Sequence, residues 1–142
     1  MKKISMTIGL AFLLAFAANA QKINASKVPA VVKASFAKAY PAVAAKWEKE
    51  DGNYEVNFNK GGHAMSAVIE RNGSIIETET AIKISDLPVK VAAYVKEHYS
   101  GNPIKESSMI INADRSESYE ARVDGKDLIF DRNGKFIKEA KD

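Results

Sequence analysis

The segment DGNYEVNFNK, residues 51–60, decides the fold, because it joins a tight turn to an alternating strand. Asp51-Gly52 is a dipeptide that accepts the positive φ angles of a two-residue hairpin turn. After the turn, apolar and polar side chains alternate, which places one face of a strand on a core and the other in water. The apolar positions are Tyr54, Val56 and Phe58.

The same pattern returns later in the chain, so the sequence contains an internal repeat. Residues 117–126 read ESYEARVDGK, again an alternating strand beside an Asp-Gly dipeptide. This strand recurs at an offset of 65 residues, and two further pairs of segments match at offsets of 59 and 61 residues, a spread that changes in loop length produce. These pairs are Ser26-Lys27-Val28-Pro29 with Ser85-Asp86-Leu87-Pro88, and Ile69–Gly73 with Phe130–Gly134. We therefore predict two diverged copies, residues 24–84 and 85–142.

Each copy is predicted to begin with a helix and continue with four strands. Ser26 and Ser85 are expected N-caps, with Pro29 and Pro88 in the first turn of each helix. The expected strands lie between Asp-Gly and Asn-Gly pairs, whose residues accept the positive φ angles that a tight primed turn requires. Their ranges are 43–50, 54–60, 63–70 and 74–84 in the first copy, and 104–112, 118–124, 127–131 and 135–139 in the second.

This order of elements predicts an α+β fold, with two tandem α-β-β-β-β repeats in a mainly antiparallel sheet and both helices on one face. Apolar residues at helical spacing and on alternating strand positions give the expected core. In the first copy the core is Val28, Val32, Phe36, Tyr54, Val56, Phe58, Ala67 and Ile69. In the second copy it is Leu87, Val91, Val95, Tyr119, Ala121, Val123, Leu128 and Phe130.

Residues 1–20 show the three-part pattern of a secretory signal peptide. Two lysines precede an uncharged apolar run from Ile4 to Ala17, which is shorter than a membrane-spanning helix requires. Small residues then precede a predicted cleavage between Ala20 and Gln21. We expect a single domain, residues 21–142, in the periplasm or secreted, with no membrane insertion after cleavage. Removal of Lys2 and Lys3 leaves 19 basic against 18 acidic residues, a balance that does not favour nucleic-acid binding.

The order of motifs in the first copy resembles the PepSY-like proteins that Bacteroidetes export to the periplasm. The matching residues are Val28-Pro29, Val32, Phe36, Tyr40-Pro41, Trp47, the run from Asp51 to Val56, and Asn72-Gly73. That family is similar in fold to β-lactamase inhibitor protein, a tandem of two α-β4 units. The second copy departs from the pattern, since Ser100 replaces the proline after tyrosine and no second tryptophan appears. The resemblance implies binding or inhibition of another exported protein, and no catalytic residues.

Few residues offer chemistry. His63 in a hairpin and His98 at a helix end occupy non-equivalent places in the two copies, which argues against a shared metal site. Without cysteine, thiolate ligands and thiol nucleophiles are excluded. We predict no catalytic residue, no metal and no cofactor. The sole tryptophan, Trp47, is expected in the core.

The leading hypothesis is a non-enzymatic binding module that contacts an exported or envelope protein through the helix-free face of the sheet. Two alternatives stay open. One is a hydrolase of envelope polysaccharide that uses paired carboxylates such as Glu77 and Glu79. The other is a structural or assembly factor that binds peptide at a sheet edge. The residues expected on the contact face are Glu55, Asn57, Glu77, Glu79, Glu120 and Arg122.

Overall fold

The computed structural model describes residues 20–140, and the predicted signal peptide lies almost entirely outside them. Within this range the chain forms two α-helices and nine strands, with a short 3-10 helix before each α-helix. The first half contains β1 (Gln21–Ile23), α1 (Ala30–Ala39), β2 (Lys46–Glu50), β3 (Asn53–Lys60), β4 (His63–Ile69) and β5 (Ile75–Ala81). The second half contains α2 (Val89–His98), β6 (Ile104–Asn112), β7 (Glu117–Val123), β8 (Lys126–Asp131) and β9 (Phe136–Ala140).

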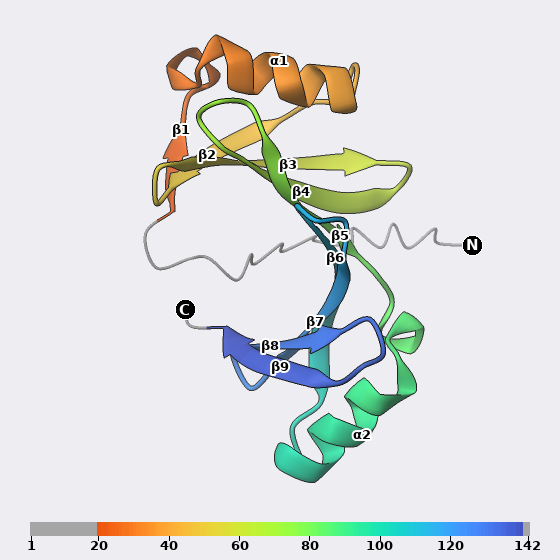
Figure 1. Ribbon diagram of the computed structural model, residues 1–142. Coiled ribbons are helices and arrows are strands. Elements are labelled where there is room, and N and C mark those ends of the chain that lie inside the picture. The colour runs from red at the N-terminus through yellow and green to blue at the C-terminus, as the bar shows by residue number, and fades with distance from the viewer. Residues whose placement is uncertain (1–19, 141–142) are drawn as a thin grey trace, which may run out of the picture.

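All nine strands join one antiparallel sheet in sequence order, β1 to β9. The register keeps the core residues of both halves on a single face of the sheet. The pairs Val56↔Ala67, Ala67↔Thr78 and Thr78↔Ile111 continue this face from β3 into β6. The predicted repeat architecture is therefore confirmed, including the placement of both helices on one face of the sheet. Figure 1 shows the sheet bent at β5 and β6, with α1 and α2 on its outer sides.

Each helix covers its own hydrophobic cluster. In the first half Phe36 of α1 meets Trp47 of β2 edge-on at 5.6 Å and Phe58 of β3 at 5.1 Å. In the second half Tyr94 of α2 packs edge-on against Phe130 at 5.5 Å. Fifteen of the sixteen predicted core residues are buried, and Tyr119 is half-buried against the second cluster. Trp47 is 6% exposed, as expected for a core residue.

The predicted helix starts are wrong. Ser26 and Ser85 lie in the two 3-10 helices, Ala25–Lys27 and Ile84–Asp86, and neither caps an α-helix. The N-cap positions of α1 and α2 are Pro29 and Pro88, with no side-chain cap. A proline here loses little, because the first N–H groups of a helix have no intrahelical partner. The short strand β1 and both 3-10 helices were not predicted, since three residues give no periodicity.

The turns confirm part of the hairpin prediction. Asp51-Gly52 and Asp124-Gly125 have positive φ at both residues, as primed turns require. At the two Asn-Gly pairs only the glycine has positive φ, so the expectation of a primed turn is wrong there. Gly134 also lies close to α2: a Cβ at this position would be 2.9 Å from Pro88 Cβ. These loops are therefore shaped by contact with a helix as well as by turn preference.

Candidate functional site

The helix-free face carries most of the buried polar side chains of the described residues. Strand register places all six predicted contact residues there: Glu55 opposes Val68, Val68 opposes Glu77, and Asn57 opposes Ser66. Further along the sheet, Ser108 opposes Glu120 and Arg122 opposes Asp127. Alternation along a strand then assigns Glu79, two residues after Glu77, to the same face.

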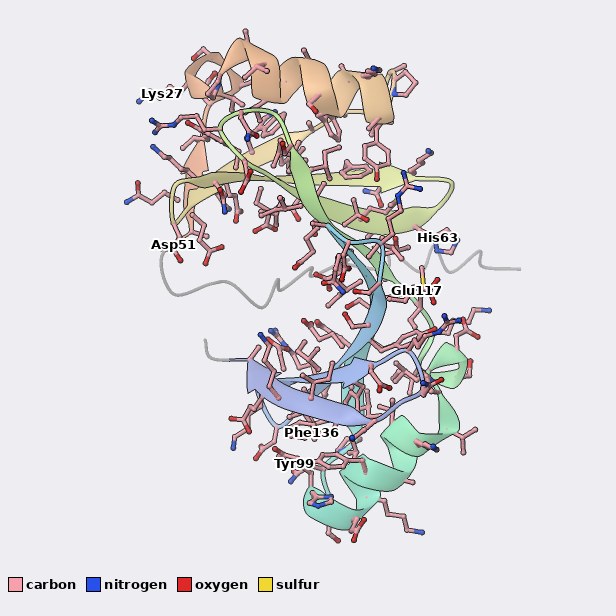
Figure 2. All side chains as sticks on the ribbon, in the orientation of Figure 1. Lys27, Asp51, His63, Tyr99, Glu117 and Phe136 are labelled. Atoms are coloured by element: carbon pink, nitrogen blue, oxygen red, sulfur yellow. The ribbon has the colours of Figure 1, made fainter. Side chains whose placement is uncertain are left out.

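These side chains are not solvated as the alternation predicted. Glu55, Glu79 and Glu120 are 3%, 5% and 7% exposed, and Asp127 is fully buried. The bend of the sheet explains the difference, because it turns the helix-free faces of the two halves towards one another (Figure 1). Figure 2 shows side chains from both halves pointing into the space between them. The face is therefore a concave, crowded polar surface.

The charge of a residue on a distant strand also acts on this face. Burial raises the pKa of Glu77 in β5, and the Lys138 ammonium in β9 acts in the opposite direction. β5 and β9 are four strand spacings apart, which would be about 19 Å in a flat sheet. A charge at that distance would be largely screened. A curled sheet accounts for the effect of Lys138 on the pKa of Glu77.

Burial and mutual repulsion shift the titration of the carboxyl groups on this face. Burial, followed by repulsion from Glu48, Glu50 and Glu79, raises the pKa of Glu55 to about 8. Burial raises the pKa of Glu79 to about 7. Burial and the nearby Glu79 raise the pKa of Glu120 to about 9. Near neutral pH this face therefore holds several protons that carboxyl groups in water would have released.

One ion pair crosses the face between β7 and β8. Arg122 donates from Nε to Asp127 Oδ1 and from Nη2 to Asp127 Oδ2, both at 2.7 Å. The planar guanidinium and carboxylate groups thus form two parallel hydrogen bonds. These bonds satisfy the carboxylate of Asp127, whose side chain has no contact with solvent. This hydrogen bond to Asp127 also raises the pKa of the Arg122 guanidinium. Arg122, expected as a free contact residue, is thus engaged within the fold.

A pocket of about 180 Å³ opens beside the β2–β3 hairpin. Four of its seven lining residues are acidic, and two are aliphatic. The lining residues are Glu50, Asp51, Asn53, Glu55, Val68, Ile76 and Glu77. Of the six predicted contact residues, only Glu55 and Glu77 line this pocket. Strand alternation does not point to Glu50, Asp51 or Ile76, although the Asp51-Gly52 turn beside a glutamate was a usable signal.

Several polar atoms on this face have no partner within residues 20–140. Glu55 Oε1, Asn57 Oδ1 and Ser108 Oγ are buried and accept or donate no hydrogen bond. Buried polar atoms without partners are uncommon in folded proteins and mark places where a ligand or water completes the structure. No cluster of three or more His, Cys, Asp or Glu side chains in the described range is arranged to hold a metal ion.

The two histidines are apart from this face. His63 is exposed at the start of β4, and Figure 2 shows it pointing outward. His98 stacks on Tyr94 with ring centroids 4.0 Å apart, and its Nδ1 lies 3.0 Å from the Tyr94 carbonyl oxygen. Neither contributes to the pocket. In residues 20–140 no helix has the length and apolar character to cross a bilayer.

Comparison with known proteins identifies relatives. A family model described as "Putative beta-lactamase-inhibitor-like, PepSY-like" matches residues 16–77 and again residues 53–138. No functionally curated protein matches. A solved structure from Bacteroides eggerthii, described as one of the "putative periplasmic proteins", superposes with a TM-score of 0.70 at 14% identity, over 79% of this chain and 87% of that one.

Two other solved structures are similar. A DUF2874 family protein from Bacteroides ovatus has a TM-score of 0.67 at 22% identity, over 78% of this chain and 85% of that chain. A BLIP-like protein from Bacteroides fragilis has a TM-score of 0.62 at 24% identity, over 77% of this chain and 82% of that chain. At these identities the similarity establishes a shared fold.

Proposed function

Because this chain belongs to the PepSY-like, β-lactamase-inhibitor-like family, we propose that it is an exported, non-enzymatic module that binds another envelope protein through its helix-free face. The observation that supports this most is the concave polar face with buried, unpartnered groups. A face built only for stability would pair those groups or replace them with apolar ones. Residues 1–20 then act as the signal peptide, and the folded product is residues 21–142 in the periplasm.

Binding also needs a surface of sufficient area. A stable protein–protein contact buries about 800 Å² on each partner. Nine strands present a continuous surface for this, and its half-buried positions Glu48, Val68, Asn112 and Ile129 lie between the buried carboxyl groups. Polar groups at such a surface give specificity, since a mismatched partner would leave them buried and unpaired.

A pull-down from the native envelope fraction tests this proposal, with residues 21–142 as bait. The variant Asn59→Arg with Asn112→Arg adds two charges to the helix-free face. The matched control, Ala37→Arg with Ala92→Arg, adds two charges to the exposed outer sides of α1 and α2. We expect a partner that the first variant loses and the control retains. If the control variant loses the partner and the variant of the helix-free face retains it, the contact surface lies on the helices.

The acidic pocket supports a second candidate, the carboxylate-based hydrolase. Burial raises the pKa values of Glu50, Glu55 and Glu77, and acid catalysis uses such groups. Hydrolysis by a carboxyl pair needs one group that stays protonated and another that stays ionised. The pKa values of these three groups are all raised, and burial is the main cause for each. Glu79, the predicted partner of Glu77, does not line the pocket. Release of reducing sugar from purified envelope polysaccharide, lost in Glu77→Gln, would favour this candidate over the binding module.

Peptide addition at a sheet edge has less support. The first edge, β1, is three residues long, and the other edge, β9, carries Lys138 and Glu139. Short and charged edges are the features by which proteins prevent strand addition. The assembly-factor alternative therefore depends on the concave face as well.

A further inference from the structure

We propose that the pocket beside the β2–β3 hairpin receives one lysine or arginine side chain of the partner protein. This inference rests on the proposed function and names the chemistry of that partner. Four features of the described residues support it. They are the composition of the pocket, a carboxyl oxygen without a partner, a β-bulge that brings an aliphatic side chain to the pocket, and a difference in charge between the two repeats.

The pocket matches a cation on an aliphatic stem. Acidic side chains come from β2, the hairpin turn, β3 and β5, while Val68 and Ile76 provide an apolar wall. Lysine and arginine combine a hydrocarbon stem with a terminal positive charge, so both parts find complementary groups here. The volume of about 180 Å³ is below the range of pockets that hold whole small molecules, and it suits a single side chain.

Glu55 identifies where the charge would lie. This residue is 3% exposed and lines the pocket, yet its Oε1 has no hydrogen-bond partner within residues 20–140. An unpaired acceptor in such a site costs free energy until a donor reaches it. An ammonium or guanidinium group supplies N–H donors and the opposite charge at once.

A β-bulge shapes the apolar wall. Ile69 pairs with Ile75 and Val68 pairs with Glu77, so Ile76 is an extra residue between them. Bulges of this kind redirect a side chain and occur often beside functional sites. In a regular strand Ile76 would point to the side opposite Glu77, whereas here both line the pocket. The bulge thus brings a hydrophobic side chain next to a carboxyl group.

The second repeat provides an internal comparison. Its register is the same, with Glu120 opposite Ile129, Ile129 opposite Lys138, and Ile137 as the extra residue of an equivalent bulge. Lys138 therefore occupies the place that Glu77 has in the first repeat. The scaffold is duplicated, but its charge is reversed at this position. The acidic pocket is a property of the first repeat rather than a consequence of the fold.

Occupancy should release a proton from the pocket. Glu48 and Glu50 on β2 and Glu79 on β5 are the carboxyl groups that act on Glu55, while Asn57 is its polar neighbour on β3. Together with burial they raise the pKa of Glu55 to about 8, so its carboxyl group is mostly protonated at pH 7. A bound cation favours the carboxylate and lowers this pKa. The proton passes to solvent, and binding becomes tighter as the pH rises towards 8.

The direct test is a titration of residues 21–142 with N-acetyl-arginine amide and N-acetyl-lysine amide, followed by the methyl NMR signals of Val68 and Ile76. N-acetyl-citrulline amide is the neutral isostere of the arginine probe. We expect saturable shifts of both methyl groups with the cationic probes and none with citrulline. Equal shifts with citrulline, or no shifts with any probe, would overturn the proposal.

Variants then separate a pocket effect from a general charge effect. Glu77→Gln should weaken probe binding about tenfold, the loss expected for one hydrogen bond to a charged group. Glu117→Gln is the control, because Glu117 is an exposed carboxylate on β7 that does not line the pocket. Figure 2 shows it far from Asp51 of the hairpin. Equal weakening by both variants would contradict a defined site.

Two further experiments identify the source of the cation. Tighter binding of spermidine than of the peptide probes would assign the pocket to a free polyamine and overturn the proposal. The envelope pull-down can also yield a partner that binds Glu77→Gln as well as the wild type. This result would support the binding module and refute the insertion of a cationic side chain into the pocket. If the probes bind but no envelope protein is captured by any bait, the proposed function and this inference fail together.

Discussion

Replacement of Glu55 by glutamine should make the protein more stable at alkaline pH. The folded state raises the pKa of this carboxyl from 4.5 to about 8, chiefly by burial. A group with a raised folded-state pKa holds more protons in the folded state than in the unfolded state, so stability falls as pH rises. The contribution of the Glu55 carboxyl group to the free energy of unfolding is fully present below about pH 4.5 and is lost as the pH rises through about 8.

The size of the effect follows from the shift. One pKa unit corresponds to 1.36 kcal/mol, so the rise at Glu55 corresponds to about 4 kcal/mol between pH 4.5 and 8.5. Relaxation and water entry reduce this, and we expect about 2–4 kcal/mol. Glutamine has nearly the same shape and no charge. The variant Glu55→Gln should therefore gain that amount relative to the wild type over this pH range.

Urea unfolding of residues 21–142 at several pH values between 4.5 and 8.5 measures the difference. Glu117→Gln is the matched control, because it makes the same substitution at an exposed position on β7. The reasoning is refuted if Glu55→Gln and the wild type lose stability in parallel with rising pH. It is also refuted if Glu117→Gln gives the same gain as Glu55→Gln.

Three further substitutions test the fold. Arg122→Ala should cost about 3–5 kcal/mol in urea unfolding, because it leaves the buried Asp127 carboxylate without its partner; a cost similar to that of an exposed arginine would show that the pair is unimportant. Gly134→Ala should destabilise by about 1–3 kcal/mol more than Gly62→Ala, since both glycines have positive φ but only the first would place its Cβ against α2; equal losses would refute the contact. Phe36→Ala should lower the free energy of unfolding by about 3–5 kcal/mol, and retention of the wild-type value would show that α1 is not packed on the sheet.

The architecture was predictable because two periodicities dominate it. Alternation around Tyr54 and Tyr119 gave the strands, and helical spacing from Val28 and Leu87 gave the stripe that each helix buries. Both signals depend on local sequence and on the hydrophobic effect, and the repetition of the pattern allowed each copy to support the other. The helix starts were missed because the 3-10 helices use the serines that would otherwise have been caps.

The site was predictable only in part. Alternation placed Glu55 and Glu77 on the helix-free face, and strand register confirms that position. It could not show that the face is buried, because that depends on the bend of the whole sheet at β5 and β6. It also could not place Ile76 in the pocket, since a bulge adds one residue and breaks the alternation from which faces are read.

Site-specific photo-crosslinking in the native envelope tests the central claim most directly. A photoreactive residue would replace Asn59 or Lys138, which are exposed on the helix-free face, or Lys38 or Lys96, which are exposed on the helices. The binding module predicts an adduct with one envelope protein from both positions of the helix-free face and from neither helix position. Adducts confined to the helix positions would contradict the assignment of the contact surface.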